Sequence, residues 1–462
     1  MRGLPAFTFA AFFVLCDTAA ARPSPCVTSH KGLFYANDFS YLKKPCPPHC
    51  LGDCLKLMPM GNCGQYGTLD IGGQLRYRYH HEEGMGRSVA IPGADGFLNT
   101  QNDFTLSRLR LYGNWKVNDT IRVFVEGIHA DAARNSDYDP RPIDINRGDL
   151  LNAFVDVKVA DGLTVRVGRQ ELLYGVQRTV SPLDWANTRR TFEGIRGLYK
   201  KDDWAIDMFY TNFVPVDFND FDEADYDQSF YGLYSTYTGR ENTTMEWYYL
   251  GYDHQTVGAP IATDFSLHTL GGRVQGKAFE KWFYETEAAY QFGRQSGLQL
   301  DHDAGFVTGG IGRALTNMPW NPVLWAYIDY ASGNSAGGDF NRFNQLFPLA
   351  HKYLGFIDAV ARSNVISPNV RLTMAPTKKW NLLLWYYYFG ADSVNDIIPG
   401  VAVPSAQVLG DGTFGNELDL IAKYKITPRS QILFGYSHLW RGSKIIGTND
   451  ADFFYTKWTL NF

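Results

Sequence analysis

Short segments that alternate apolar and polar residues recur along most of this chain, and they constrain its fold more than any other feature. In DFTLSRLRLYGNW, residues 103–115, Arg108 and Arg110 alternate with Leu109 and Leu111. Successive side chains of a β-strand point to opposite faces, so this strand has one cationic face and one apolar face. Similar segments begin at residue 68 and continue to the end of the sequence. We therefore expect a sheet with an apolar environment on one side and a polar one on the other.

Eighteen candidate strands are separated by breaks at Gly, Asp, Asn or Pro. They are expected near residues 68–81, 104–117, 119–130, 150–160, 162–173, 192–200, 203–213, 229–238, 243–254, 266–277, 281–292, 303–313, 322–332, 364–375, 378–389, 415–427, 429–440 and 450–462. Short turns such as KVND, ADG, PTKKW and TPR alternate with long connections, as in outer-membrane barrels of bacteria, whose strand number is even. The predicted fold is an all-β, transmembrane antiparallel β-barrel of about 18 strands over residues 68–462.

The physical chemistry of a bilayer supports this fold. A sheet in lipid must close on itself, because every backbone N–H and C=O group there needs an internal partner. Eighteen strands enclose an aqueous lumen instead of a packed core. No run of 18 or more apolar residues follows residue 21, which argues against a transmembrane helix. We expect a multi-pass barrel in the bacterial outer membrane, in contact with its lipid.

The first 67 residues differ from the rest. Residues 1–21 read as a signal peptide, with Arg2, the apolar stretch AFTFAAFFVL and a cleavage site after Ala21. Residues 22–67 form a Cys/Pro-rich periplasmic leader. In an exported chain its cysteines are disulfide candidates, and their odd number leaves one thiol over. The candidates are Cys26, Cys46, Cys50, Cys54 and Cys63. The alternative is a metal site made of Cys46, Cys50, Cys54 and His49. The leader could plug the periplasmic mouth or dock a periplasmic partner.

Composition and motifs argue against other classes of function. A net charge of −5 and a pI near 6.1 do not fit a nucleic-acid binder. GNSAG at 333–337 is not followed by a helix, as a nucleophile elbow requires, and GDGTFG at 410–415 precedes a strand. Glu285 and Glu287 share a strand face and could act as an acid–base pair, but they are more simply partners of luminal Arg. We expect no enzymatic activity, no cofactor and no metal.

Basic residues predominate on the faces that should point into the lumen. Arg binds carboxylates with two parallel hydrogen bonds, and a ring of Arg in a narrow wet channel enriches anions. The inward basic residues are Arg76, Arg78, Arg108, Arg110, Arg122, Arg166, Arg196, Arg273, Arg371, Lys423 and Lys457. The inward acidic residues, which could simply neutralise them, are Glu126, Asp156, Glu285, Glu287, Asp329, Glu417 and Asp419. Both readings are open: an anion path, or cross-strand ion pairs.

Two stretches resemble the alginate export family of outer-membrane porins. They are VGRQELLYGVQRTVSPLDWANTRRTFEGIR, residues 167–196, and YASGNSAGGDFNRFNQLFPLAHKYLGFIDAVARSNV, residues 330–365. The resemblance implies an 18-stranded barrel whose electropositive constriction passes an anionic uronate polysaccharide. The residues that fit its two signatures are Arg169, Glu171, Trp185, Asn187, Arg190, Phe192, Arg196, Phe347, Pro348, His351, Lys352, Tyr353 and Asp358. Val176, Glu193 and the SGN at 332–334 depart from the family pattern and put the exact substrate in doubt.

On this basis we expect the loops at 174–191 and 333–363 to fold inward or cap the pore. They would add Arg189, Arg190, His351 and Lys352 to the substrate path, with Arg169 on the barrel wall and Glu171 as a charge partner.

The functional hypothesis is a monomeric outer-membrane channel for an anionic polysaccharide or oligosaccharide resembling alginate. The alternatives are a general anion-selective porin of the same fold and an exported β-rich enzyme that acts on polysaccharides. In the barrel, Arg108 and Arg110 would face water, and Tyr112 would lie near a membrane interface. Changing both arginines to Ser should then leave folding nearly intact and weaken anion selectivity.

Overall fold

The computed structural model describes residues 26, 28–45, 47, 49–85, 101–134, 140–255, 264–335, 337–400, 407–447 and 449–462. The expected signal peptide and Cys46 lie outside these residues. Among the described residues, no helix is both long and apolar enough to cross a bilayer.

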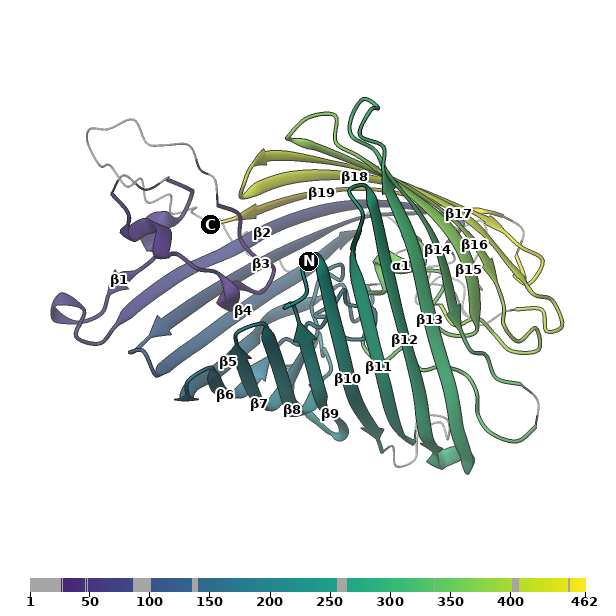
Figure 1. The fold of residues 1–462 in the computed structure, drawn as a ribbon, viewed down its shortest axis with the longest axis horizontal. Coiled ribbons are helices and arrows are strands. Elements are labelled where there is room, and N and C mark those ends of the chain that lie inside the picture. Colours follow the sequence, from purple (N-terminus) through teal and green to yellow (C-terminus); the bar gives the residue numbers. More distant parts are fainter. Residues whose placement is uncertain are drawn as a thin grey trace, which may run out of the picture.

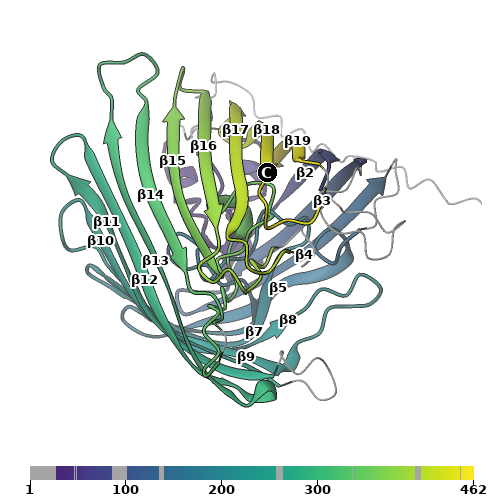
Figure 2. The same cartoon turned by 90° about the vertical axis from the view of Figure 1, so that its right-hand side faces the viewer.

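Eighteen antiparallel strands, β2 to β19, close into a barrel (Figures 1 and 2). They are β2 (Thr68–Glu83), β3 (Gln101–Lys116), β4 (Ile121–Arg134), β5 (Asn146–Ala160), β6 (Leu163–Gln170), β7 (Thr191–Lys201), β8 (Trp204–Val214), β9 (Asp225–Tyr237), β10 (Thr243–His254), β11 (Phe265–Ala278), β12 (Trp282–Gln295), β13 (Leu300–Ala314), β14 (Val323–Ala331), β15 (Val365–Met374), β16 (Trp380–Gly390), β17 (Thr413–Thr427), β18 (Ser430–Arg441) and β19 (Ala451–Asn461). Each strand pairs with the next, and β19 pairs with β2 from Asp452↔Glu83 to Asn461↔Gln74, which leaves no free edge within the barrel. The predicted fold and strand positions are confirmed.

Helical structure in the described residues is confined to short pieces. A two-residue strand, β1 (Met58–Pro59), pairs with the start of β2. The leader also contains the 3₁₀ turns η1 (Phe34–Ala36), η2 (Ser40–Lys43), η3 (Asp53–Leu55) and η4 (Asn62–Gly64). The other short pieces are η6 (Ser296–Leu298) and α1 (Ala350–Tyr353) in connections between strands.

The two ends of the barrel differ as the sequence predicts. Short turns join β3 to β4 and β5 to β6 at one end, where the leader and the C-terminus also lie (Figure 1). Most of the connections at the other end are long. Short periplasmic turns and long outer loops are the usual asymmetry of these barrels, and on this ground we call the short-turn end the periplasmic end. Phe462 closes the last strand there, because its backbone N–H donates to the carbonyl of Gly73 at 3.0 Å.

The alternation along β3 separates the two environments. Arg108 and Arg110 are buried inside the barrel, whereas the side chain of Leu111 is 48% exposed on the outer surface. Tyr112 was expected near an interface, but it points inward and its ring lies 5.0 Å from that of Phe34 in the leader. This expectation is wrong because Tyr112 lies on the same face of β3 as Arg108 and Arg110, where the leader provides an apolar surface.

The inside of the barrel is not filled by water alone. The connection between β6 and β7 and that between β14 and β15 both fold into it. Val180 of the first and Phe347 of the second form a bridge, and Phe347 packs against Phe192 and Phe230 on the barrel wall, with ring centroids 5.0 and 4.9 Å apart. We expected the barrel to enclose an aqueous lumen instead of a packed core. The lumen instead contains packed apolar side chains, because these loops bring their own into it.

The outward position of Val307, in the middle of β13, gives a test of the membrane-facing surface. A lysine at this position would meet lipid and should lower the free energy of unfolding by about 2–4 kcal/mol if it lies at the bilayer midplane. The control is Met318→Lys in the exposed turn between β13 and β14, which should cost much less. Denaturant unfolding in lipid vesicles measures both, and equal costs would contradict the assigned membrane face.

Candidate functional site

The two inward-folded connections form one unit, the inner plug, which comprises residues 171–190 and 332–364. The indole of Trp185 stacks on the imidazole of His351 with centroids 3.2 Å apart. Backbone hydrogen bonds from Ser181 N–H to the carbonyl of Phe347 and from Phe347 N–H to that of Thr179 join the two segments. The two stretches that carry the family resemblance therefore meet inside the barrel.

Arginines of the barrel wall hold the inner plug in place. Arg78 donates to the carbonyl of Trp185, and its guanidinium carbon lies 3.8 Å from the indole centroid. Arg76 and Arg108 both donate to the carbonyl of Ala186. These arginines were expected to donate to water or substrate, but they donate to backbone carbonyls of the inner plug instead. Arg108 is 2% exposed, so the expectation that it faces open water is wrong.

Asp184 is a carboxylate at the tip of the inner plug. It lies 2.8 Å from Arg108 Nη2, pairs with Arg189 and is 4.0 Å from Arg76 Nη1. Half of its side chain (51%) is exposed, so it faces the space inside the barrel. Burial opposes its ionisation, but the guanidinium groups of Arg108 and Arg189 outweigh burial and hold the pKa of this carboxyl well below its usual range.

Ion pairs neutralise most of the predicted luminal arginines. Arg110 Nε lies 2.6 Å from Glu126 Oε1, and both side chains are fully buried. The other pairs join Arg122 and Arg166 to Asp156, Arg169 to Asp149 and Glu193, Arg189 to Glu171, Arg196 to Asp207, and Arg273 to Glu246 and Glu285. Asp329 and Glu287 pair with Arg362 and Arg178, two residues of the inner plug that the sequence analysis missed. These arginines chiefly fix the plug and strands to one another.

Five of the predicted charged residues have other surroundings. Arg190 donates to the carbonyls of Ser181 and Pro348 within the inner plug. Lys352 is exposed and donates to the Tyr353 hydroxyl at 2.8 Å, and Arg371 lies 4.9 Å from the ring of Trp385. Glu417 and Asp419, expected as partners of Arg, form no ion pair with Lys or Arg in the described residues. Glu417 instead accepts the backbone N–H of Ile357 at 2.9 Å.

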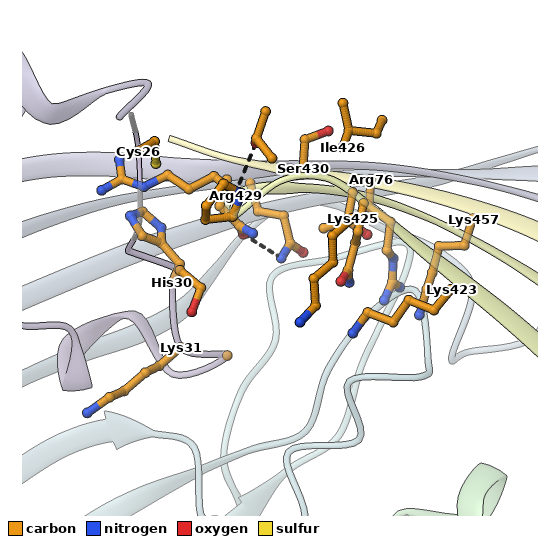
Figure 3. A pocket seen from close by; sticks show the side chains of 18 of the residues that line it. Cys26, His30, Lys31, Arg76, Lys423, Lys425, Ile426, Arg429, Ser430 and Lys457 are labelled. Carbon is orange, nitrogen blue, oxygen red and sulfur yellow. Dashed lines mark hydrogen bonds between the residues drawn. The ribbon is translucent and has the colours of Figure 1, made fainter. Parts of the chain in front are cut away.

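A cavity of about 940 Å³ lies between the inner plug and the periplasmic mouth (Figure 3). Strands β2, β3, β17, β18 and β19 and the turn between β15 and β16 line it, together with leader residues 26 and 29–32. Its basic lining residues are Lys31, Arg76, Arg108, Lys378, Lys379, Lys423, Lys425, Arg429 and Lys457. Asp184 is the one acidic lining residue among those the structure describes. The lining therefore carries an excess of cations, and a confined excess of this sign favours anions.

Only part of this lining was expected. Arg76, Arg108, Lys423 and Lys457 were predicted to point inward, and they line the cavity. The cations at the mouth were missed, although the short turns PTKKW and TPR, which carry three of them, were recognised as turns. Counting charges at the periplasmic turns would have found these three. Lys31 and Asp184 had no such signal, because their positions depend on how the leader and the inner plug fold.

The Arg110–Glu126 pair gives a first test. Arg110→Ser leaves the carboxylate of Glu126 buried without its main counter-charge, which should lower the free energy of unfolding by about 3–5 kcal/mol. Adding Glu126→Gln to this variant should recover much of the loss. Denaturant unfolding in vesicles measures the stability of both variants. If Arg110→Ser does not lower the free energy of unfolding, the expectation that this change leaves folding nearly intact is restored.

His351 gives a second test through pH. Burial lowers its pKa from 6.5 to about 4, although the carboxylate of Asp358 lies 2.9 Å from Nδ1 and opposes the shift. The folded state therefore resists protonation, so the stability that neutral His351 contributes is complete above pH 6.5 and is lost as the pH falls towards 4. His351→Gln should flatten this part of the pH profile of the denaturation midpoint. The control is His49→Gln in the exposed leader, and the same flattening there would contradict the assignment.

Comparisons with known proteins agree with this architecture. OpdQ of Pseudomonas aeruginosa has a TM-score of 0.58 at 12% identity, over 85% of this chain and 98% of that one. OccAB3 of Acinetobacter baumannii has a TM-score of 0.57 at 12% identity, over 85% and 100%. OpdK of P. aeruginosa, solved with vanillate, has a TM-score of 0.57 at 10% identity, over 85% and 98%. At these identities the likeness shows the fold alone. A comparison with curated proteins found no significant match.

The sequence itself identifies the family. The family model for alginate export matches residues 68–455, which is nearly the whole barrel and includes both stretches of the inner plug. The closed barrel and the similar solved structures place the protein in the bacterial outer membrane, where such a barrel acts as a porin-type channel. The chain belongs to the alginate export family of outer-membrane β-barrel proteins.

Proposed function

We propose that the protein passes an anionic polysaccharide or oligosaccharide of the uronate type through the cationic cavity, by diffusion and without covalent chemistry. The observation that carries this proposal is the lining of the cavity, in which nine Lys and Arg side chains face a single carboxylate, that of Asp184. A uronate chain carries one carboxylate on each sugar, so it presents a row of charges that matches such a lining. The barrel closes within one chain, and we propose that the monomer is the working unit.

The kind of cation supports movement through the cavity as well as binding. Most arginines of the lumen are held by carboxylates, whereas Lys423, Lys425 and Lys457 line the cavity and form no ion pair in the described residues. Lys carries a compact, strongly hydrated charge on a flexible side chain, and it lacks the rigid two-point grip of Arg. Conduction needs sites that attract an ion but also release it. Lysines suit that requirement better than fixed arginines do.

A second candidate is a porin for small anions. The inner plug fills much of the lumen, and the structure of OpdK, which has the same type of fold, was solved with vanillate, a small carboxylate. The two candidates share the anion path and differ in the size of the solute that passes through.

Planar bilayer recording tests the proposal. The wild type should be anion-selective, and oligouronates should block its current. Lys423→Gln with Lys457→Gln should reduce both effects several-fold, because these residues supply the charge at the cavity wall. The control is Lys277→Gln, near the periplasmic end of β11 and outside the cavity lining, which should behave like the wild type.

The outcomes separate the candidates. Cation selectivity would overturn both of them. Anion selectivity with a current that responds to small carboxylates, but not to oligouronates, would favour the small-anion porin.

A further inference from the structure

The N-terminal leader enters the periplasmic mouth of the barrel. Phe34 is 1% exposed, and the guanidinium carbon of Arg110 lies 4.2 Å from its ring. Tyr35 packs edge-on against Phe124 and Phe154, at centroid distances of 5.4 and 5.1 Å. These contacts join the leader to the inner faces of β3, β4 and β5 (Figure 1). An aromatic pair so deeply buried fixes a segment far more firmly than surface contacts would.

Polar contacts complete this first anchor. The carbonyl of Gly32 accepts from both terminal nitrogens of Arg110, and the carbonyl of Tyr35 accepts from Arg122 Nη1 at 2.8 Å. The Tyr35 hydroxyl donates to the carbonyl of Glu171 at 3.0 Å, which links the leader to the inner plug. The leader thus covers two arginines that would otherwise face the mouth on the β3–β5 side.

A second anchor holds the leader at the turn between β17 and β18. Arg429 of this turn is almost fully buried and lies 2.7 Å from the carboxylate of Asp53. It also donates to the hydroxyl of Tyr41 at 2.7 Å and to the carbonyl of Leu51. The leader therefore spans the mouth from β3–β5 to β17–β18. The cavity lies beneath this span.

A disulfide between Cys26 and Cys50 lies at the second anchor, where Arg429 Nε also donates to the carbonyl of Thr28. The cysteine pattern left open whether the leader forms disulfides or a metal site. Because Cys50 is bonded to Cys26, it is not available to the alternative metal site. Cys63 is an exposed free thiol. Cys26 itself lines the cavity, so the disulfide lies at the rim of the space that an anion would enter (Figure 3).

We propose that the leader is a fixed periplasmic plug that seals the β3–β5 side of the mouth and forms one wall of the anion site, so that the transported anion passes between leader residues 29–32 and strands β17–β19. This inference rests on the proposed function and adds the route and a specificity-determining wall to it. His30 and Lys31 lie on one side of the cavity, opposite Lys423 and Lys457 (Figure 3). The leader lies outside the stretch that the family model matches.

Lys31 carries the charge of this wall. Burial, together with the cations of Arg429 and Lys56, lowers the pKa of His30 to about 3, so His30 is neutral at neutral pH. The Lys31 side chain is exposed and belongs to the cavity lining, and it extends away from Lys423 and Lys457 (Figure 3). The leader thus brings one positive charge and several backbone groups to the path, from a segment that is distant in sequence from the facing strands.

Removal of the first anchor tests the plug. Phe34→Ala with Tyr35→Ala should unseat the leader on the β3–β5 side and raise the single-channel conductance several-fold. Tyr66→Ala, which alters an exposed side chain of the same leader outside both anchors, is the control and should leave conductance unchanged. The change in gel mobility on heating shows that each barrel has folded.

Removal of one charge tests the wall and does not depend on unseating the leader. Lys31→Gln should reduce anion selectivity and the block by oligouronate, whereas Lys44→Gln, an exposed leader lysine outside the cavity lining, should not. Unchanged conductance in the double alanine variant, or equal behaviour of Lys31→Gln and Lys44→Gln, would overturn the proposal. The proposed function would still stand in that case, provided that the wild type is anion-selective and is blocked by oligouronate.

Discussion

The closed hydrogen-bonded sheet is the constraint on which the rest of this structure depends. Lipid offers no partner to a backbone N–H or C=O group, so the last strand must pair with the first. Because the sheet closes, every second side chain of each strand must point into a confined interior. Arg110 and Glu126 show the consequence: both are fully buried, and each meets the charge of the other. Many charged side chains that closure confines to the interior are therefore paired with opposite charges.

This neutralisation divides the basic residues into two groups with different tasks. Arg76, Arg78 and Arg108 bind carbonyls of the inner plug, and their rigid fork makes several hydrogen bonds at once. Lysines such as Lys423 and Lys457 line the cavity, and the proposed function assigns them to the attraction and release of the anion. These arginines hold the inner plug to the barrel wall, whereas the role of the lysines belongs to the proposed function.

The sequence alone predicts the barrel wall well, because a period of two residues is a local property that each strand displays by itself. It predicts that Arg108 and Arg110 point inward for the same reason. It does not predict what stands opposite them. The partner of Arg108 is Asp184, 76 residues further along the chain, and Arg110 meets Gly32 from the leader. Such contacts depend on the folding of loops, for which alternation carries no information. Tyr112 was misplaced for another reason: it lies on the same strand face as Arg108 and Arg110, so the alternation already placed it inward.

Net charge is a poor guide to the field inside such a molecule. The chain carries −5 overall, yet the cavity has nine cationic side chains and one anionic one in its lining. The two facts agree because many of the carboxylates are paired with arginine or lie on loops, so they contribute little to the potential of the cavity. A field confined by low-dielectric walls depends on the charges that remain unpaired nearby. In this protein those charges come from the barrel wall, the periplasmic turns and the leader, three parts of the chain that only the fold brings together.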